Sequence, residues 1–325
     1  MKKSAVADAN IYLPKKKPLS VRVKNALPFL IMILPGFVAL ALFAYKPLYG
    51  LLIAFKEYKL RLGVFASPWA DNYGFEYFID LFKGARFINS LGNTLVISLA
   101  SLFLNMPFTI ILALLINEMR GVVYKRIVQT ITYLPHFFSW VVLGGIFKTL
   151  FAPIGPVNSA LMNLGFESVP FLTNGGAFMT VILSTKIWQS MGWGAIIYIA
   201  ALSGVDESLY EAAYIDGASR WKQVWHISIP SILGTIITVF ILNLGGILNA
   251  GYEQIYNMYN ALVKDAVDVL DTYILETISG TNSGGSYNYG IGTALGLFKS
   301  VVGLVLVLVS NKFVSIISND EYGIL

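Results

Sequence analysis

The stretch ESLYEAAYIDGASRWKQVWHISIPSI, residues 207–232, decides the fold class because of what surrounds it. No Asp, Glu, Lys or Arg occurs between Lys186 and Asp206 before it, or between Lys222 within it and Glu253 after it. Each charge-free stretch is long enough to cross a bilayer, since about 20 helical residues span roughly 30 Å of hydrocarbon. Residues 207–232 are therefore predicted to form a loop between two membrane-spanning helices.

The composition of the whole chain agrees with a membrane protein. Of its 325 residues, 56% are hydrophobic and only 13% are charged, whereas a soluble domain carries about 25% charged residues. These values argue strongly against a water-soluble enzyme. Because the chain has no cysteine, disulfides and thiolate metal sites are excluded. Its two histidines, His136 and His226, lack carboxylate neighbours at ligand spacing, so no metal site is expected.

Charge-free stretches along the chain predict an all-α polytopic membrane protein with six transmembrane helices. They are placed at 27–46, 94–116, 127–149, 178–202, 229–250 and 290–317. Six spans put both termini on the same side of the membrane. The segments that face the cytoplasm when both termini are cytoplasmic carry more Lys and Arg than the outer segments, which is the usual positive-inside arrangement.

The segments between the spans complete the predicted organisation. The divisions are a basic cytoplasmic tail at 1–26, a first transmembrane helix and outer interfacial segment at 27–93, a transmembrane domain at 94–318 with a cytoplasmic loop at 203–228, and a cytoplasmic tail at 319–325. The basic run is interpreted as a topology anchor rather than a nucleic-acid site. Amphipathic stretches at 47–60 and 75–91 are predicted to be interfacial helices, and 279–290 a flexible stretch.

The loop itself is predicted to be two short helices joined at a glycine. Asp216-Gly217 is a strong turn signal, Gly217 is free to take a positive φ, and Ser219 is expected to cap the second helix. Apolar residues recur at helical spacing on both sides of the turn, at Tyr210, Ala213 and Tyr214 and at Trp221, Val224 and Trp225. Such a hairpin either docks onto a partner or folds against the chain's own helices, and its residues alone favour neither.

Several signatures are missing from the sequence. There is no G-x-x-x-x-G-K-[ST] phosphate loop, so the chain does not bind ATP in that way by itself, and no H-E-x-x-H or G-x-S-x-G motif of a membrane hydrolase. No acidic residue lies in the middle of a span, which argues against a proton- or sodium-coupled transporter. No filter sequence suggests an ion channel.

The loop resembles the EAA motif of permease subunits in binding-protein-dependent ABC importers of the type I fold. The matching residues are Glu211, Ala212, Ala213, Asp216, Gly217, Ala218, Ile227 and Pro230. Ile229 stands where Leu is usual, and Val224 where Phe is common. The Asn93-Thr94 pair resembles the start of the family's transmembrane domain. The runs 252–274 and 292–303 are similar to the subgroup that imports oligo- and polysaccharides.

This resemblance implies the type I permease fold, with a coupling hairpin between helices 4 and 5, in the bacterial cytoplasmic (inner) membrane. It implies a second permease, more often a homologous subunit than a copy, two cytoplasmic ATPases that hold ATP and Mg, and an extracytoplasmic solute-binding protein. The chain itself would be no enzyme and would hold no cofactor. Glu211 would pair with a basic residue of the ATPase, and Gly217 would allow the sharp turn.

A saccharide path needs aromatic faces for sugar rings and polar groups for hydroxyls. Candidates are Trp188, Gln189, Trp193, Asn243, Asn249, Tyr252 and Glu253. Interhelical hydrogen bonds or interface anchoring would equally explain these residue types. Lys186 and Lys299, inside predicted spans, could serve an anionic saccharide such as a uronate polymer, or could snorkel or form a structural pair. An amino acid or phosphate importer is the alternative, and a secondary transporter is less favoured.

Overall fold

The computed structural model describes residues 19–281 and 287–317. These residues belong to two compact units, Met1–Leu52 and Ile53–Leu325, and each unit is considered by itself. Three predicted features lie wholly or partly outside the described residues: the basic tail at 1–26, the flexible stretch at 279–290 and the tail at 319–325. All regular structure in the described ranges is helical apart from one isolated bridge between Lys56 and Trp69.

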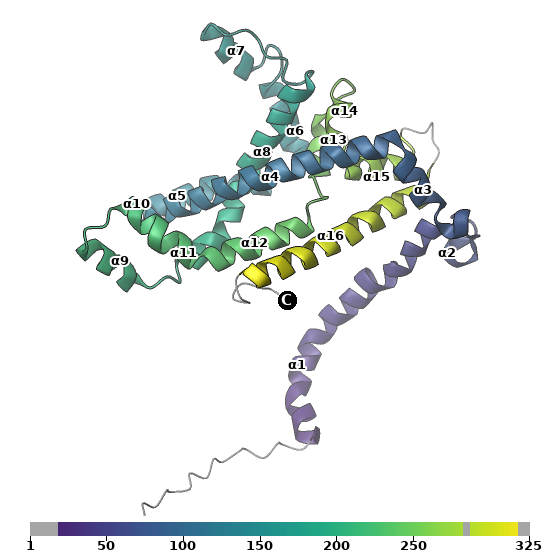
Figure 1. Ribbon diagram of the computed structural model, residues 1–325, viewed down its shortest axis with the longest axis horizontal. Coiled ribbons are helices and arrows are strands. Elements are labelled where there is room, and N and C mark those ends of the chain that lie inside the picture. Colours follow the sequence, from purple (N-terminus) through teal and green to yellow (C-terminus); the bar gives the residue numbers. More distant parts are fainter. Residues whose placement is uncertain (1–18, 282–286, 318–325) are drawn as a thin grey trace, which may run out of the picture. The chain divides into compact units, whose positions relative to one another are not determined.

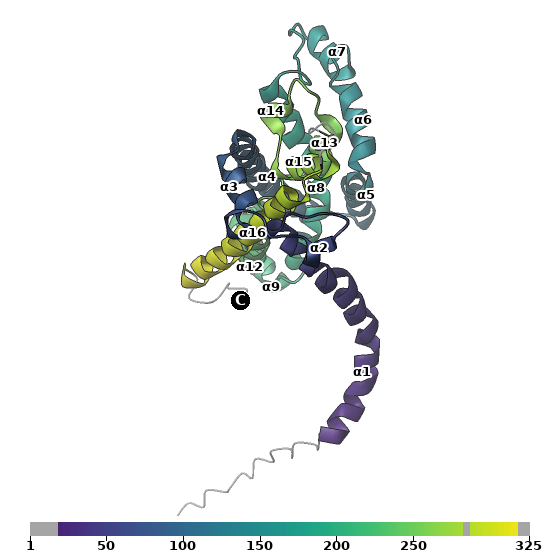
Figure 2. The ribbon, with the colours of Figure 1, turned by 90° about the vertical axis from the view of Figure 1, so that its right-hand side faces the viewer.

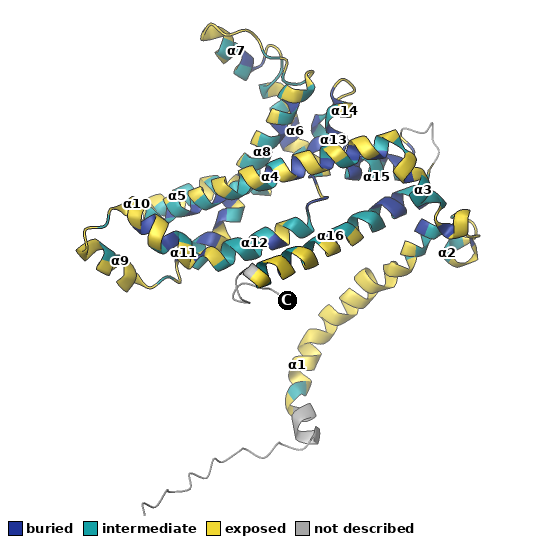
Figure 3. Cartoon of the chain, in the orientation of Figure 1, coloured by how far each residue is buried: buried dark blue, intermediate teal, exposed yellow. Residues whose placement is uncertain are grey.

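In the part of the chain that the structure describes, the first unit contains the helix α1, Leu19–Leu40, and its continuation. A π-helical turn, η1 (Ala41–Tyr45), and a 3-10 helix, η2 (Lys46–Phe55), extend it, and the run Asn25–Phe55 is apolar enough to cross a membrane. Figure 3 shows residues 27–49 of this run exposed. The span predicted at 27–46 is therefore longer, because residues 47–55 continue the helical run.

The second unit holds the remaining helices (Figure 1). They are α2 (Gly63–Ala66), η3 (Asn72–Gly74), α3 (Glu76–Lys83), α4 (Ala85–Glu118), α5 (Val122–Tyr133), η4 (Leu134–Phe137), α6 (Trp140–Leu150), α7 (Pro156–Asn163), α8 (Gly175–Leu202), α9 (Glu207–Ile215), α10 (Arg220–Gln223), η5 (Val224–Ser228), α11 (Ile229–Ser231), α12 (Leu233–Gly245), α13 (Tyr252–Met258), α14 (Lys264–Val267), α15 (Leu270–Ser279) and α16 (Tyr289–Ile317). The long helices α4 and α8 pack along each other.

Among the described residues, three helical runs are long and apolar enough to span a membrane: Asn25–Phe55, Ala85–Glu118 and Tyr289–Ile316. Two bent pairs, Val122–Phe137 with Trp140–Leu150 and Arg220–Ser231 with Leu233–Gly245, raise this number to five if each pair is one span. The predicted span at 178–202 corresponds to α8, which is long enough but is not one of these runs, and which carries lysine, glutamine and serine side chains. The described helices thus have the length and composition that the predicted membrane-protein class requires.

Two predicted spans are not the straight helices that were expected. The one at 127–149 breaks between η4 and α6, where the axes meet at 100°. Pro135 has no N–H to continue the helix, and Ser139 starts α6 by accepting a hydrogen bond from the Val142 amide. The one at 229–250 bends by 59° before α12 and ends at Gly245, so residues 246–251 are not helical.

Buried side chains of the second unit form three clusters that tie these helices together. One joins α4 and α8 to α13 and α14, one joins α3, α4, α15 and α16, and one joins α4, α8 and α12. The turned view in Figure 2 shows α7 at the far end of α6, away from the helices α12 and α16. Since α4 contributes to all three clusters and α8 to two, this pair forms the centre of the unit.

Candidate functional site

A pocket of about 390 Å³ opens between α4, α8 and α12. Four predicted path residues, distant in sequence, line it together: Lys186, Trp193, Asn243 and Asn249. The other lining residues are Ser98, Ser101, Leu102, Asn105, Met106, Thr109, His136, Ser190, Gly194, Ile197, Tyr198, Val239, Gly246 and Ile247. Sequence reasoning missed the α4 serines, which look like ordinary small helix-packing residues at the level of sequence.

The pocket has a positive charge without a negative one. Lys186 is the cation, and the described lining includes no Asp or Glu. The Lys186 Nζ donates a hydrogen bond to the carbonyl of Ala250 over 3.2 Å. Among the described residues, its acceptor is thus a neutral backbone carbonyl. Because an ammonium group in a poorly hydrated site is costly without a counter-charge, this arrangement favours an anion in the pocket.

Polar atoms without protein partners also gather in this pocket. The Oγ atoms of Ser98 and Ser101 and the Nδ1 of His136 are buried, and no described residue bonds to them. Most buried polar groups in proteins are hydrogen-bonded, so these atoms are available to a ligand or to water. The imidazole of His136 stacks on the indole of Trp193, with ring centroids 4.7 Å apart and planes 3° from parallel. The half-exposed Trp193 thus has one ring face covered by His136.

Two candidates in span four, Trp188 and Gln189, and two just after span five, Tyr252 and Glu253, do not line the pocket. The Gln189 amide points to the His136 carbonyl at 3.5 Å and so faces the break between η4 and α6. Trp188 packs edge-on against Phe147, with ring centroids 5.7 Å apart. Tyr252 and Glu253 are exposed in the first turn of α13. The structure therefore separates a pocket group of four residues from these four.

The loop between α8 and α12 forms the predicted hairpin. Gly217 has φ +74°, and the amides of Gly217 and Ala218 close the end of α9 on the carbonyls of Tyr214 and Ala213, at 3.0 and 2.9 Å. This is a Schellman motif, in which glycine supplies the left-handed residue. The prediction that Ser219 caps the second helix was wrong: its side chain makes no cap bond, and the Gln223 amide instead ties the turn to the Ala218 carbonyl over 3.2 Å.

The hairpin folds partly on itself and leaves apolar side chains in solvent. The Tyr210 hydroxyl is hydrogen-bonded to Ser228 of η5 over 2.9 Å, whereas Tyr214, Ile215 and Trp221 are at least 74% exposed. A groove of about 390 Å³ lies among them, lined by Tyr210, Glu211, Tyr214, Ile215, Arg220 and Gln223. Of the docking candidates, Glu211, Ala212, Asp216 and Gly217 are exposed, and Ala213 and Ala218 are half-buried. An exposed apolar surface with a central carboxylate suits a protein partner.

Comparison with known proteins identifies the family. Residues 105–319 match the family described as binding-protein-dependent transport system inner membrane component. The chain belongs to this family. It is accordingly a multi-pass inner-membrane permease of an ABC transporter and not a catalytic enzyme, as the EAA resemblance implied.

Two curated relatives of the permease are from Bacillus subtilis (strain 168). Protein LplB is 42% identical over 282 residues, which are 86% of both chains. The polygalacturonan/rhamnogalacturonan transport system permease protein YteP is 38% identical over 299 residues, covering 92% of the permease and 91% of YteP. Both matches extend well beyond the family domain.

Two solved structures are similar along almost the whole permease. One is a bacterial ABC transporter involved in the import of the acidic polysaccharide alginate, with TM-score 0.80, 38% identity and coverage of 91% of the permease and 97% of that chain. The other is a bacterial alginate ABC transporter in complex with alginate pentasaccharide-bound periplasmic protein, with TM-score 0.81, 36% identity and coverage of 94% and 99%.

Lys299 lies apart from Lys186 in the permease. It faces a pocket of about 480 Å³ between α12, α15 and α16, where it forms an ion pair with Asp271. Asn249 lines both this pocket and the one that holds Lys186. The sequence left open whether Lys299 forms a structural pair. In the structure its partner in such a pair is Asp271.

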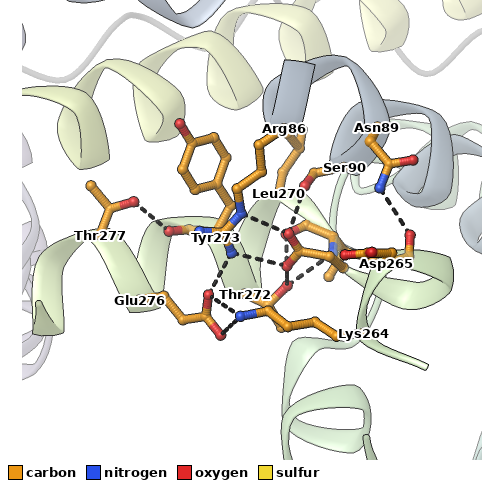
Figure 4. Close-up of polar contacts among 12 residues, drawn as sticks. Arg86, Asn89, Ser90, Lys264, Asp265, Leu270, Thr272, Tyr273, Glu276 and Thr277 are labelled. Atoms are coloured by element: carbon orange, nitrogen blue, oxygen red, sulfur yellow. Dashed lines mark hydrogen bonds and ion pairs between the residues drawn. The ribbon is translucent and has the colours of Figure 1, made fainter. Parts of the chain in front are cut away.

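A cluster of buried charges, which sequence reasoning missed, joins α4 to the segment 264–277 (Figure 4). Arg86 forms ion pairs with Asp268 and Glu276, and Lys264 forms one with Glu276 over 2.8 Å. Both carboxylates are at most 5% exposed. The excess of acidic residues in 251–289 was a visible signal, but nothing in the sequence pointed to Arg86 as their partner.

Hydrogen bonds surround this cluster. The Ser90 hydroxyl donates to Asp268 over 3.1 Å, and the Asn93 amide donates to the carbonyls of Asp265 and Asp268 over 2.9 and 3.1 Å. Thr94 accepts a bond from the Leu270 amide over 2.9 Å. The Asn93-Thr94 pair that marked the family resemblance therefore attaches the segment 264–277 to α4.

The cluster shifts the acidity of its members. Burial alone would raise the pKa of Glu276, but hydrogen bonds from Lys264, Tyr259 and Arg86 and the charge of Arg86 outweigh it, so the pKa lies below its ordinary value. Burial and the hydrogen bond to Glu276 raise the pKa of Tyr259, which keeps that hydroxyl a donor, at 2.8 Å from the Glu276 carboxylate. The cluster is thus built for an ionised Glu276.

Proposed function

We propose that the permease forms part of the membrane path of an ATP-driven importer for an acidic oligo- or polysaccharide that an extracytoplasmic solute-binding protein delivers. The observation that carries this proposal is the pocket between α4, α8 and α12, where Lys186 faces no described carboxylate. The names of YteP and of the alginate transporters, whose substrates are acidic polysaccharides, support the same class of substrate.

The pocket has the groups that a uronate ring requires. Lys186 would bind the carboxylate, the indole of Trp193 would cover the apolar face of the ring, and the unpartnered hydroxyls of Ser98 and Ser101 would bond to sugar hydroxyls. Asn243 and Asn249 add amides that both donate and accept. Gln189, Trp188, Tyr252 and Glu253 would act outside this pocket, and Lys299 would serve structure through Asp271.

Six spans, with both termini in the cytoplasm, fit this function. Each bent pair would cross the membrane once, and α8 would be the sixth span. The polar side chains of α8 support its inclusion, because Lys186, Gln189 and Ser190 all bond to groups of the chain itself instead of facing lipid unpaired. The segment 251–289 would then lie outside and 203–228 inside.

The hairpin α9–α11 would be the coupling element. Its exposed apolar residues and Glu211 would occupy a cleft of one of two cytoplasmic ATPases, which bind ATP and Mg. Because α11 continues into α12, a movement of the hairpin would reach Asn243 in the pocket wall. The second permease is proposed to be a homologous subunit, and the bilayer is the remaining partner.

The test is uptake by reconstituted complexes. The complete complex of both permeases, ATPases and binding protein in proteoliposomes should import oligogalacturonides in an ATP-dependent way, and the purified chain alone should neither hydrolyse ATP nor import sugar. Lys186→Met should reduce uptake at least tenfold, since a charge-assisted hydrogen bond is worth about 1.5–3 kcal/mol.

The matched control is Lys148→Met, which removes an exposed lysine of α6 that lines neither pocket. It should leave uptake unchanged. Equal uptake by Lys186→Met and Lys148→Met would remove Lys186 from the path, and ATP-driven uptake by the single chain would contradict the whole assignment.

A further inference from the structure

Gly251 lies directly after the carbonyl that holds Lys186. It has φ +82°, in the left-handed region that other residues rarely adopt, and it ends the non-helical segment 246–251 before α13 begins at Tyr252. Ala250, whose carbonyl accepts from the Lys186 Nζ, is fully buried. The direction of this carbonyl therefore depends on a backbone turn that glycine makes possible.

The same glycine leaves the space beside the ammonium group open. A Cβ placed on Gly251 would lie 3.4 Å from the Nζ of Lys186 and 3.7 Å from its Cε. These are van der Waals contacts and not clashes, so a side chain could fit there, but it would cover one side of the ammonium group. Since Lys has three N–H donors and one goes to Ala250, such a cover would hinder the two that remain for a ligand.

Side-chain hydrogen bonds from α13 hold this turn in place against α8. The amide of Gln254, which is 1% exposed, donates to the Ile182 carbonyl and to the Thr185 hydroxyl, both over 2.8 Å. Thr185 immediately precedes Lys186 in α8. Hydrogen bonds on both sides of Gly251 therefore hold it against Lys186, and the glycine cannot be replaced without changing the surroundings of the ammonium group.

We propose that Gly251 is a positioning residue for Lys186 and thereby determines the preference of the pocket for carboxylate-bearing over neutral sugars. The left-handed turn directs the Ala250 carbonyl to one N–H of Lys186, and the missing side chain leaves the other two free to meet a carboxylate. This inference rests on the proposed function, because it concerns the same pocket.

Binding of two matched ligands tests this role. The assembled complex of both permeases and the ATPases, in lipid nanodiscs without binding protein, is titrated with trigalacturonate and with its fully methyl-esterified, neutral form. The wild type should bind the acid roughly tenfold more tightly or better, as expected for a charge-assisted hydrogen bond. Gly251→Ala should reduce this ratio to near one, and Gly165→Ala should keep it. Gly165 has a similar left-handed φ of +86° but does not line the pocket, and a Cβ there would meet no atom within 4 Å.

A second variant separates backbone strain from the covering of Lys186. Asn accepts left-handed φ far better than Ala does, so Gly251→Asn should keep the turn and still cover the ammonium group. It should lose the preference for the acid as Gly251→Ala does. Lys186→Met should lose the preference too, and adding Gly251→Ala to it should change the ratio no further, because the two residues act as one unit.

The outcomes distinguish this inference from the function beneath it. Equal binding of acid and ester by the wild type would contradict the acidic substrate itself. A wild type that prefers the acid, with the preference retained in either Gly251 variant, would overturn only the positioning role. A further loss when Gly251→Ala is added to Lys186→Met would also overturn it, since Gly251 would then act independently of Lys186.

Discussion

Arg86 donates a hydrogen bond from Nε to the Oδ2 of Asp268 over 2.8 Å, although 182 positions of the chain separate the two residues. The guanidinium also lies 4.4 Å from the ring centroid of Tyr273 and forms a second ion pair with Glu276. One residue in the first turn of α4 thereby holds the segment that contains α14 and α15. This contact attaches the segment to α4, which also lines the pocket.

Arg86→Gln should destabilise the permease by about 3–5 kcal/mol, because it removes the cation that pairs with the buried Asp268 and one of the two cations that pair with the buried Glu276. Thermal unfolding in detergent would measure this as a lowered midpoint, and hydrogen exchange should rise first in residues 264–279. Lys59→Gln is the control: its pair with Glu57 is more than half exposed on both sides and should contribute no more than about 1 kcal/mol. Similar unfolding of both variants would contradict the role of the cluster.

Stability should depend on pH through Glu276. Its pKa is lowered in the folded protein, so the stabilisation is complete above the unfolded value of about 4.3 and is lost as the pH falls through the folded value. The contribution of Glu276 to the unfolding midpoint temperature should therefore be constant from pH 6 to 8. The midpoint temperature should decrease once the pH is below about 4. Glu276→Gln should unfold earlier at neutral pH and show a shallower acid dependence. A variant with the full acid dependence of the wild type would contradict this assignment.

Gly217→Ala should strain the turn of the hairpin α9–α11 by about 1–2 kcal/mol, since φ +74° is left-handed. The hairpin has few internal contacts, so the strain should deform it and loosen the ATPase, while insertion of the spans is unaffected. Co-purification of the ATPase in detergent would measure this. Gly204→Ala, in the same loop but without a left-handed φ, should retain the ATPase. Equal retention in both would show that the turn does not matter for docking.

Glu211→Ala should uncouple transport without destabilising the permease. Glu211 is exposed beside Tyr214 and Arg220 in the hairpin groove, so its loss should change the unfolding free energy by less than about 0.5 kcal/mol. If Glu211 pairs with a basic residue in a desolvated interface, its loss should weaken that interface by about 2–5 kcal/mol. ATP hydrolysis stimulated by the loaded binding protein should fall as a result. Glu207→Ala, one helical turn earlier, should retain stimulation. Normal stimulation in Glu211→Ala would argue against docking through this residue.

The hairpin was predictable from sequence because its determinants are local. A glycine after Asp216 ends α9 with two backbone hydrogen bonds that involve neighbours within five residues. The expected cap by Ser219 failed although the residue occupies the right position, because a side-chain cap depends on rotamer and competing contacts, and here Gln223 ties the turn. Local sequence thus determined the path of the backbone better than the hydrogen bonds of its side chains.

Span boundaries were predictable only in part. Charge-free stretches located the apolar helices, but α4 begins at Ala85 and not at 94, since Arg86 is neutralised by Asp268 and Glu276 and does not end the helix. Conversely, the apolar stretches at 127–149 and 229–250 contain breaks near Pro135 and after Gly245 that hydropathy does not register. Hydropathy reports the environment of a segment and not its backbone geometry.

The sequence by itself determined the membrane class, the hairpin and the family, because each depends on composition or on spacing within one segment. It also supplied the right residue types for a sugar path, yet it gave no reason to separate Lys186 from Lys299. Only the tertiary structure decided that, by placing Asp271 against Lys299 and a backbone carbonyl against Lys186. The physical reason is that the state of a charge depends on what lies within a few ångströms of it, and α15 and the segment 246–251 reach the two lysines only when the chain is folded.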